Sequence, residues 1–307
     1  MEIKRRNVLK TIGLGSIAAV QPVSAFSMPK KKGKFTYCLN TSTIRGQDPG
    51  LAKYIEIAAE AGYDGIEIWI QDLKKFLADG NSTSTLKTMI ENSGLKVENA
   101  IGFAPWMVAD KDKSRQGFLQ MEEEMNLLAA IGCKRVAAPG VGAEAPVDLV
   151  LAGEKFKDLL DLGRKTGVMP QLEFWGAFKP FYHLGQILMV AAVANDPDAR
   201  LLPDIFHLYR GGSGFDGLKL INGNAIEIFH MNDFQGNIPR EEQSDKDRVY
   251  PGDGVGPLVQ VVRDLKNMGG DKVLSLELFN PEYWKEDPLH VAKTGLAKMK
   301  AIVKAAN

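Results

Sequence analysis

The sequence predicts an α/β protein that folds as a single-domain (β/α)8 barrel. From Lys34 onward, eight short runs rich in apolar and β-branched residues alternate with eight segments of helical periodicity. Repeated βα units of this kind form either an open doubly wound sheet or a closed barrel. No Gly-x-Gly-x-x-Gly follows the first strand, and the last unit ends on a helix. These features favour the closed TIM barrel, which typically uses about 250 residues as one domain.

The predicted strands are short and mostly apolar, as expected of strands buried in a parallel sheet. Turn residues bound each of them. In chain order the predicted strands are 35–41, 65–70, 97–103, 135–141, 169–175, 200–207, 225–233 and 272–279.

Between the strands, apolar residues recur at intervals of three and four, which puts one apolar stripe on each predicted helix. One such stripe runs through Phe118, Met121, Met125 and Leu128. Glycine often precedes the next strand, as at Gly167, where it suits the left-handed residue that closes a helix.

The N-terminal segment predicts export. Residues 1–25 combine a basic start, a short apolar run and the small-residue exit Val23-Ser24-Ala25, which together indicate a signal peptide. The pair Arg5-Arg6 resembles the twin-arginine export signal of bacteria, so we expect a periplasmic location. The apolar run is too short for a stable membrane anchor. Residues 26–34 are expected to form a flexible basic stub before the barrel at 35–307.

The overall charge is balanced, with 38 basic and 38 acidic side chains, and this disfavours a nucleic-acid partner. From Phe35 onward, however, 30 basic residues face 37 acidic ones, so the barrel itself is acidic. The two cysteines, Cys38 and Cys133, are expected to be buried apolar residues. A homo-oligomer is compatible with the sequence.

Four successive predicted strands end in ionisable residues, and active groups of such barrels lie at the carboxyl ends of strands. These residues are Glu173, Asp204, His230 and Glu277. Carboxylates inside apolar runs are costly to bury unless they are paired or bind a metal. An oxygen-rich set with one imidazole suits one divalent cation, manganese first, with magnesium, cobalt or zinc also compatible.

The sequence resembles the xylose isomerase-like TIM barrels, which include D-tagatose 3-epimerase, inosose isomerases and dehydratases, and endonuclease IV. The resemblance covers residues 35–307 and is strongest in PQLEFW around Glu173, in DxxH from Asp204 to His207, in HMND from His230 to Asp233, in PGDG at 251–254, and in LSLELF around Glu277. It implies that Glu173, Asp204, His230 and Glu277 bind the metal. It also implies that His207 contacts a substrate oxygen.

The groups themselves suggest a mechanism. A cation that chelates the carbonyl and neighbouring hydroxyl of a sugar acidifies a carbon-bound proton and stabilises an enediolate. Glu173 and Glu277 could then remove and return the proton from opposite faces, with His207 donating a hydrogen bond to the oxyanion. Return to the same carbon epimerises, return to the adjacent carbon isomerises, and loss of a β-hydroxyl dehydrates.

Further substrate contacts are expected from Trp106 and Trp175 at strand ends, where an aromatic face could stack on a sugar ring, and from Asp233 and Arg240. Glu67, near the end of the second strand, could face the mouth of the barrel, but a glutamate paired at the solvent side is favoured. The polar segment 234–255 is either a lid or a passive loop.

The sequence also departs from two branches of the family. The second substrate-binding glutamate of the ketose 3-epimerases is replaced by Phe178-Lys179-Pro180, and the further histidines of endonuclease IV are missing at the ends of the second and third strands.

From the candidate ligands, the N-terminal segment and the resemblance, we expect an exported metal-dependent isomerase or epimerase of an unphosphorylated sugar or cyclitol. The alternatives are a lyase or dehydratase acting on keto-sugars or keto-glycosides, and a non-catalytic sugar-binding barrel.

Overall fold

The computed structural model describes residues 33–307. The predicted signal peptide, 1–25, and residues 26–32 of the predicted stub lie outside the described part. The last two residues of the predicted stub, Gly33 and Lys34, form hydrogen bonds with the barrel. The Gly33 amide donates to the Lys266 carbonyl at 3.1 Å, and the Lys34 amide donates to Oδ1 of Asp271 at 2.9 Å.

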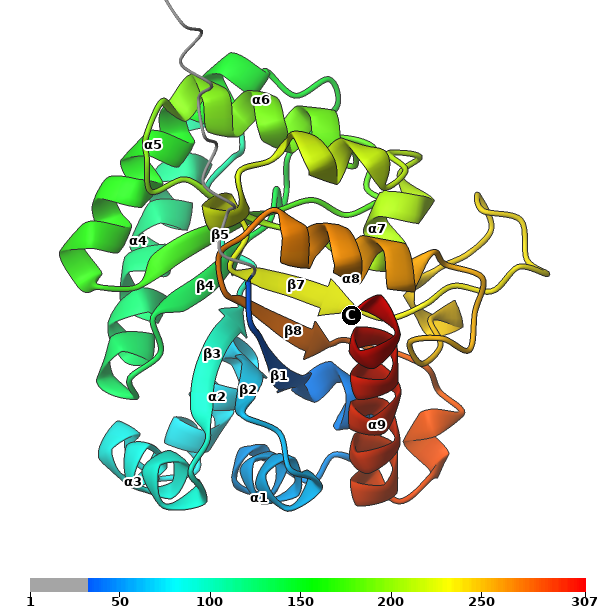
Figure 1. Ribbon diagram of the computed structural model, residues 1–307. Coiled ribbons are helices and arrows are strands. Elements are labelled where there is room, and N and C mark those ends of the chain that lie inside the picture. Colours follow the sequence, from blue (N-terminus) through cyan, green and yellow to red (C-terminus); the bar gives the residue numbers. More distant parts are fainter. Residues whose placement is uncertain (1–32) are drawn as a thin grey trace, which may run out of the picture.

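Parallel β-strands form the centre of the molecule and helices surround them (Figure 1). All eight predicted strands are present. They are β1 (Phe35–Asn40), β2 (Gly65–Trp69), β3 (Lys96–Ile101), β4 (Arg135–Ala138), β5 (Met169–Glu173), β6 (Arg200–Leu202), β7 (Ile228–Met231) and β8 (Lys272–Leu276).

The strands follow one another around the barrel in chain order, with β8 beside β1. Hydrogen bonds join them in two arcs, β3-β2-β1-β8-β7 and β4-β5-β6. Isolated bridges between Leu201 and Ile226 and between Asp204 and His230 connect β6 to β7. At the other junction β3 contacts β4, where the Arg135 guanidinium donates to the Glu98 carbonyl at 3.1 Å. The predicted (β/α)8 barrel is therefore confirmed.

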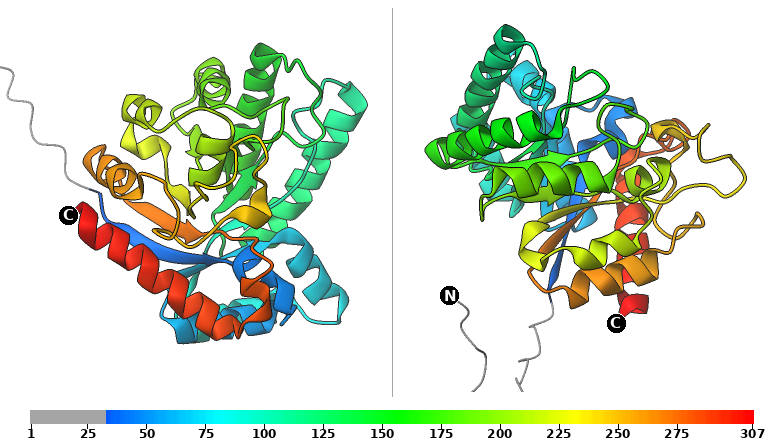
Figure 2. Two further views of the ribbon diagram at one scale, coloured as in Figure 1. Left: turned by 90° about the vertical axis from the view of Figure 1, so that its right-hand side faces the viewer. Right: turned by 90° about the horizontal axis from the view of Figure 1, so that it is seen from above.

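Helices pack around the outside of the strands (Figure 2). The α-helices are α1 (Leu51–Ala61), α2 (Ile70–Ala78), α3 (Thr83–Ser93), α4 (Lys111–Ala130), α5 (Leu149–Thr166), α6 (Leu184–Ala194), α7 (Ile205–Arg210), α8 (Leu258–Asn267) and α9 (Pro288–Ala306). Short 3-10 helices are η1 (Thr41–Gln47), η2 (Asp216–Leu220), η3 (Gly223–Ala225), η4 (Asp245–Asp247) and η5 (Tyr283–Lys285). Within residues 33–307, none of the helices combines the length and hydrophobicity needed to span a membrane.

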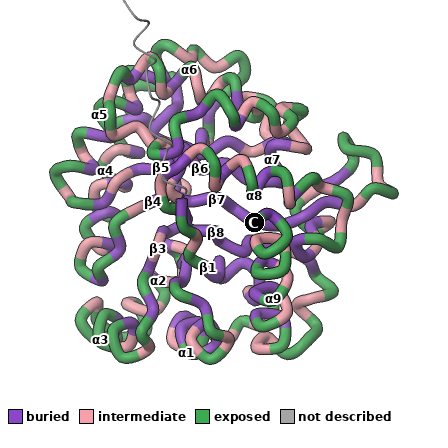
Figure 3. The backbone as a smooth tube through the Cα atoms, in the orientation of Figure 1, coloured by how far each residue is buried: buried purple, intermediate pink, exposed green. Residues whose placement is uncertain are grey.

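The predicted apolar stripes face the barrel, so the buried residues follow the strands and the inner helix faces (Figure 3). In α4, for example, Met121, Met125 and Leu128 are buried. α5 ends as predicted, because Gly167 adopts φ 76° and closes the helix. Cys38 and Cys133 are buried free thiols, as expected.

The predicted strand at 200–207 ends earlier than expected. β6 stops at Leu202, and Asp204 then caps α7 by accepting a hydrogen bond from the His207 amide at 2.8 Å. His207 therefore lies on a helix rather than on a strand. An Asp that can bond an amide three residues ahead favours the start of a helix over continued strand.

Lys272 at the start of β8 is almost fully buried, and its ammonium donates to the carbonyls of Gly223, Gly269 and Gly270 at 2.9, 2.6 and 3.1 Å. Replacing Lys272 with methionine leaves these carbonyls without a partner, so we expect a loss of about 2–3 kcal/mol of unfolding free energy. Urea denaturation measures this loss. The exposed Lys293→Met variant is the control, with an expected change below about 0.5 kcal/mol. An equal change in both variants would contradict the prediction.

Candidate metal centre and substrate pocket

The four predicted metal ligands come from consecutive strand ends on one face of the barrel. Glu173 is the last residue of β5, Asp204 follows β6, His230 lies in β7, and Glu277 directly follows β8. Parallel strands bring their carboxyl ends to the same rim, which is why residues distant in sequence meet here. All four side chains are buried.

The imidazole of His230 lies at the centre of this group. Its Nδ1 is 3.1 Å from Oε2 of Glu277, 3.8 Å from Oε1 of Glu173 and 3.8 Å from Oδ2 of Asp204. Ligand atoms of Asp204, His230 and Glu277 all lie within 4.8 Å of one another. Asp204, His230 and Glu277 are therefore close enough to share one cation, and Glu173 lies beside them with Oε1 at 3.8 Å from Nδ1 of His230.

Two atoms of this group are buried without a hydrogen-bond partner among the described residues, Nδ1 of His230 and Oε2 of Glu173. Such unpaired buried atoms are rare in folded proteins unless another group satisfies them. Three carboxylates and one imidazole are also the donor types that Mn²⁺, Co²⁺ and Zn²⁺ accept. The residues present therefore fit a divalent metal ion.

The electrostatics of the group favour a cation as well. Burial raises the pKa of Glu173 to about 8, and the charges of Glu277, Glu67 and Asp204 add to the rise. Burial alone would lower the pKa of His230, but Glu277 and Glu67 raise it well above its usual value. The neighbouring carboxylates contribute to both pKa shifts, and a bound cation would relieve this concentration of negative charge.

Glu67 in β2 is a site residue that the sequence prediction missed. It is fully buried inside the barrel instead of paired at the solvent side. Its Oε1 accepts from Nε2 of His230 at 3.1 Å and from Nδ2 of Asn99 at 2.7 Å. Its Oε2 accepts from Nδ2 of Asn40 at 2.8 Å and from Oγ of Ser275 at 2.6 Å.

The strand register explains this arrangement. Asn40 is the Cα partner of Glu67 in β1, and Asn99 is its partner in β3, so the two amides flank the carboxylate on the inner face. Because a carboxylate only accepts, Nε2 of His230 must donate, which leaves Nδ1 free for a metal. Glu67 therefore fixes the imidazole in a metal-binding tautomer.

Replacing Glu67 with glutamine should weaken metal binding by about 10–100-fold, because the amide cannot accept from all four donors and no longer fixes the His230 tautomer. Titration against a chelating indicator measures the affinity. The matched control is Glu124→Gln, which alters another buried glutamate that bonds Lys74 and Gln120 in a different part of the protein. Unchanged affinity in a folded Glu67→Gln variant would rule out this role.

Arg248 is the second missed residue. It lies in the segment 234–255 but is buried, and its NH1 atom is 2.9 Å from both Oδ2 of Asp204 and Oε2 of Glu277. Its NH2 atom contacts Asp245 at 2.5 Å and Nε2 of His207 at 3.1 Å. Paired backbone bonds between Asp233 and Val249 hold the end of this segment against the barrel, whereas residues 239–242 are exposed.

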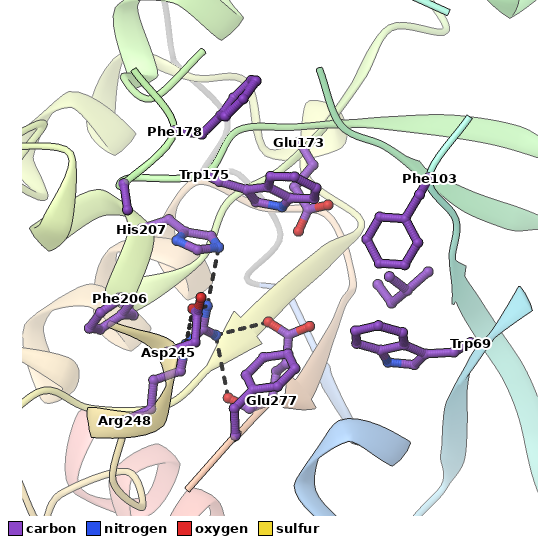
Figure 4. A pocket seen from close by; sticks show the side chains of 13 residues that line it. Trp69, Phe103, Glu173, Trp175, Phe178, Phe206, His207, Asp245, Arg248 and Glu277 are labelled. Atoms are coloured by element: carbon purple, nitrogen blue, oxygen red, sulfur yellow. Dashed lines mark hydrogen bonds and ion pairs between the residues drawn. The ribbon is translucent and has the colours of Figure 1, made fainter. Parts of the chain in front are cut away.

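A pocket of about 400 Å³ opens beside the ligand group (Figure 4). Glu173, Glu277 and His207 line it, together with Trp175, as the sequence predicted. Its other lining residues are Trp69, Ile101, Phe103, Ala177, Phe178, Phe206, Asp245, Arg248 and Phe279. The pocket is therefore lined by both ionisable and aromatic side chains.

Three residues expected to contact substrate lie elsewhere. Trp106 is fully buried, packs on Phe156 and donates to the Pro139 carbonyl, so it belongs to the core. Asp233 accepts from the amides of residues 252, 254 and 256, which ties down the PGDG segment. Arg240 pairs with Glu241 on the exposed part of the loop.

Comparisons with known proteins agree with this architecture. Residues 55–302 match the sequence profile of the xylose isomerase-like TIM barrels. An inosose isomerase of Bacillus velezensis is 29% identical over 280 residues, which cover 87% of this chain and 96% of the relative. A 3-dehydroshikimate dehydratase of Pseudomonas putida is 24% identical over 260 residues, which cover 81% of this chain and 39% of the dehydratase.

A crystal structure of the IOLI protein with a bound zinc atom superimposes with a TM-score of 0.82 and 25% sequence identity. The match covers 89% of this chain and 99% of the other. The matched profile spans most of the chain, and the barrel and its strand order agree with it. The protein belongs to the xylose isomerase-like TIM barrel family.

Proposed function

We propose that the protein is an exported, metal-dependent isomerase or epimerase that acts on an unphosphorylated sugar or cyclitol through an enediolate. The observation that carries this proposal is the convergence of the carboxylates of Glu173, Asp204 and Glu277 on Nδ1 of His230. Glu173 and Glu277 also line the pocket. The likeness to an inosose isomerase supports the substrate class and the reaction. The twin-arginine-type segment at the N-terminus supports export.

Glu173, Asp204, His230 and Glu277 would hold the cation. A divalent ion there supplies Lewis acidity that stabilises negative charge on substrate oxygens, and manganese is our first choice, with magnesium, cobalt and zinc as alternatives. Glu173 and Glu277 come from β5 and β8 and both line the pocket, so they can address a substrate carbon from two sides. One removes the proton and the other returns it.

The hydrogen bonds of His207 favour the tautomer that can donate a hydrogen bond to a negatively charged substrate oxygen. Its Nε2 lies 3.1 Å from NH2 of Arg248, and because a guanidinium only donates, Nε2 accepts. The proton of the neutral ring therefore sits on Nδ1, which is buried without a partner among the described residues. Burial lowers the pKa of His207, and Arg248 adds to this effect against the opposing charge of Asp204, so the shift favours the neutral ring. His207 donates from Nδ1 to a substrate oxygen.

An unphosphorylated substrate agrees with the charges of the pocket. Among the described residues that line the pocket, Arg248 is the only lysine or arginine. It is already paired with Asp204, Glu277 and Asp245. A phosphate dianion would find no unpaired Lys or Arg on these walls.

A dehydratase is the second candidate, favoured by the likeness to 3-dehydroshikimate dehydratase. Proton removal by the same glutamate, followed by loss of a β-hydroxyl, would give an unsaturated product. A panel of inososes, ketoses and keto-glycosides in heavy water, followed by NMR, separates the reactions. Deuterium at the carbon next to the carbonyl supports the isomerase, and an unsaturated product supports the dehydratase. Purified protein with no divalent metal and no exchange on any substrate would favour a non-catalytic sugar-binding barrel.

A further inference from the structure

Five aromatic rings that line the pocket form a continuous series, and four of them are labelled in Figure 4. Neighbouring ring centroids are 6.0 Å apart for Phe279 and Trp69, 5.3 Å for Trp69 and Phe103, 6.0 Å for Phe103 and Trp175, and 6.0 Å for Trp175 and Phe178. We call these five residues the aromatic arc. All five are partly exposed, unlike the fully buried Trp106, so they retain accessible ring surface.

Contacts with Asn40 and Arg45 fix the position of Trp69 in the arc. The indole N–H of Trp69 donates to Oδ1 of Asn40 at 3.0 Å, and the Arg45 guanidinium lies 3.8 Å from the Trp69 ring centroid. Arg45 is in turn paired with Asp72 at 2.7 Å. Trp69 therefore presents its carbon surface to the pocket and has no free polar atom to offer a ligand.

Hydrogen-bonding groups line the rest of the pocket, and Arg248 lies next to one end of the arc, with its guanidinium 5.2 Å from the Phe279 ring centroid. Beyond the metal ligands Glu173 and Glu277, the side chains that can bond a hydroxyl there are His207, Asp245 and Arg248. Asp245 and Arg248 are already bonded to each other. A ring with a hydroxyl on every carbon would bury hydroxyls against the arc without partners, which is unfavourable. A flat apolar group would instead gain stacking contacts there.

On the basis of the proposed function, we infer that the substrate is a keto-sugar or keto-cyclitol derivative with a flat apolar or aryl substituent that stacks in the aromatic arc. The oxygenated ring then faces Glu173, His207 and Glu277. A pocket of about 400 Å³ lies within the roughly 300–1,000 Å³ of sites that hold ligands larger than a single small ring. The arc is thus a specificity site distinct from the metal ligands.

Binding of unreactive alcohols tests the arc without catalysis. Trp69 and Trp175 line the pocket, so their fluorescence in the full-length protein reports ligand binding in the pocket, with or without metal. The probes are phenyl β-glucoside, methyl β-glucoside and myo-inositol. We expect the phenyl compound to bind at least about tenfold more tightly than the other two. Equal affinities for the phenyl and methyl glucosides would overturn the inference.

A matched pair of variants locates the effect. Phe178→Leu removes one ring of the arc, whereas Tyr182→Leu removes an exposed ring that does not line the pocket. We expect Phe178→Leu to reduce the phenyl preference severalfold and leave methyl glucoside binding unchanged, and Tyr182→Leu to change neither. An equal loss for both glucosides in Phe178→Leu would overturn the inference. A retained phenyl preference in a protein that exchanges no deuterium supports the arc and counts only against the proposed reaction.

Discussion

Replacing Glu277 with glutamine is expected to reduce kcat/KM by about a thousandfold or more. The carboxylate directly follows β8, lines the pocket, and has Oε2 at 3.1 Å from Nδ1 of His230. Under the proposed function, the substitution removes a negatively charged metal ligand and a proton-transfer group at once. Proton transfer by a positioned side chain alone contributes about 10²–10⁴-fold.

Metal content separates the two effects. Activity and bound metal should be measured on the same samples, and deuterium exchange at saturating metal reports proton transfer alone. The control is Glu282→Gln, an exposed glutamate after β8 that pairs with Lys285. We expect this control to retain full activity. If Glu277→Gln kept activity within about threefold at equal metal occupancy, Glu277 would have no part in the chemistry.

The barrel and the clustering of ionisable side chains at its strand ends could be predicted because their signals are local. Each strand and each apolar helix stripe can be recognised from a few consecutive residues of the sequence. The carboxyl ends of parallel strands lie at the same rim of the barrel, independent of the loop conformations. The proximity of Glu173, Asp204, His230 and Glu277 could be predicted from strand order alone, and their role as metal ligands stays a prediction. The structure brings all four together as expected.

Glu67 was harder to place because both faces of a barrel strand are buried. Ile66 and Ile68 face the helices and Glu67 faces the barrel axis, but alternation alone cannot tell the two faces apart. A usable signal was present, since Asn40, Glu67, Asn99 and Ser275 are all polar residues within predicted strands. Polar residues at matching depths of neighbouring strands indicate an internal hydrogen-bond layer.

Long-range folding explains the remaining differences. Arg248 reaches the metal ligands only because its loop folds back and pairs with Asp233. Trp106 follows β3 as Trp175 follows β5, yet its N–H bonds the Pro139 carbonyl and the ring turns into the core. Neither outcome follows from the local sequence. Both depend on contacts between segments more than 10 residues apart.

Replacing Arg248 with methionine is expected to destabilise the metal-free protein by about 3–5 kcal/mol. The guanidinium is 1% exposed and bonds Asp204, Glu277 and Asp245, so its removal leaves buried carboxylates without a cation. A bound divalent metal supplies positive charge to the same carboxylates. The loss should therefore be clearly smaller at saturating metal, because binding to the folded state alone adds stability.

Urea denaturation in chelator and in excess metal measures both losses. Arg240→Met, on the exposed part of the same loop, is the control and should change stability by less than about 0.5 kcal/mol in either condition. The guanidinium also lies over the rings of Phe206 and Phe279, at 4.9 and 5.2 Å from their centroids. If Arg248→Met cost the same with and without metal, packing on these rings would account for the loss. A larger loss of unfolding free energy in the absence of metal would instead mean that Arg248 and the cation neutralise the same carboxylates. Either positive charge would then stabilise the folded protein.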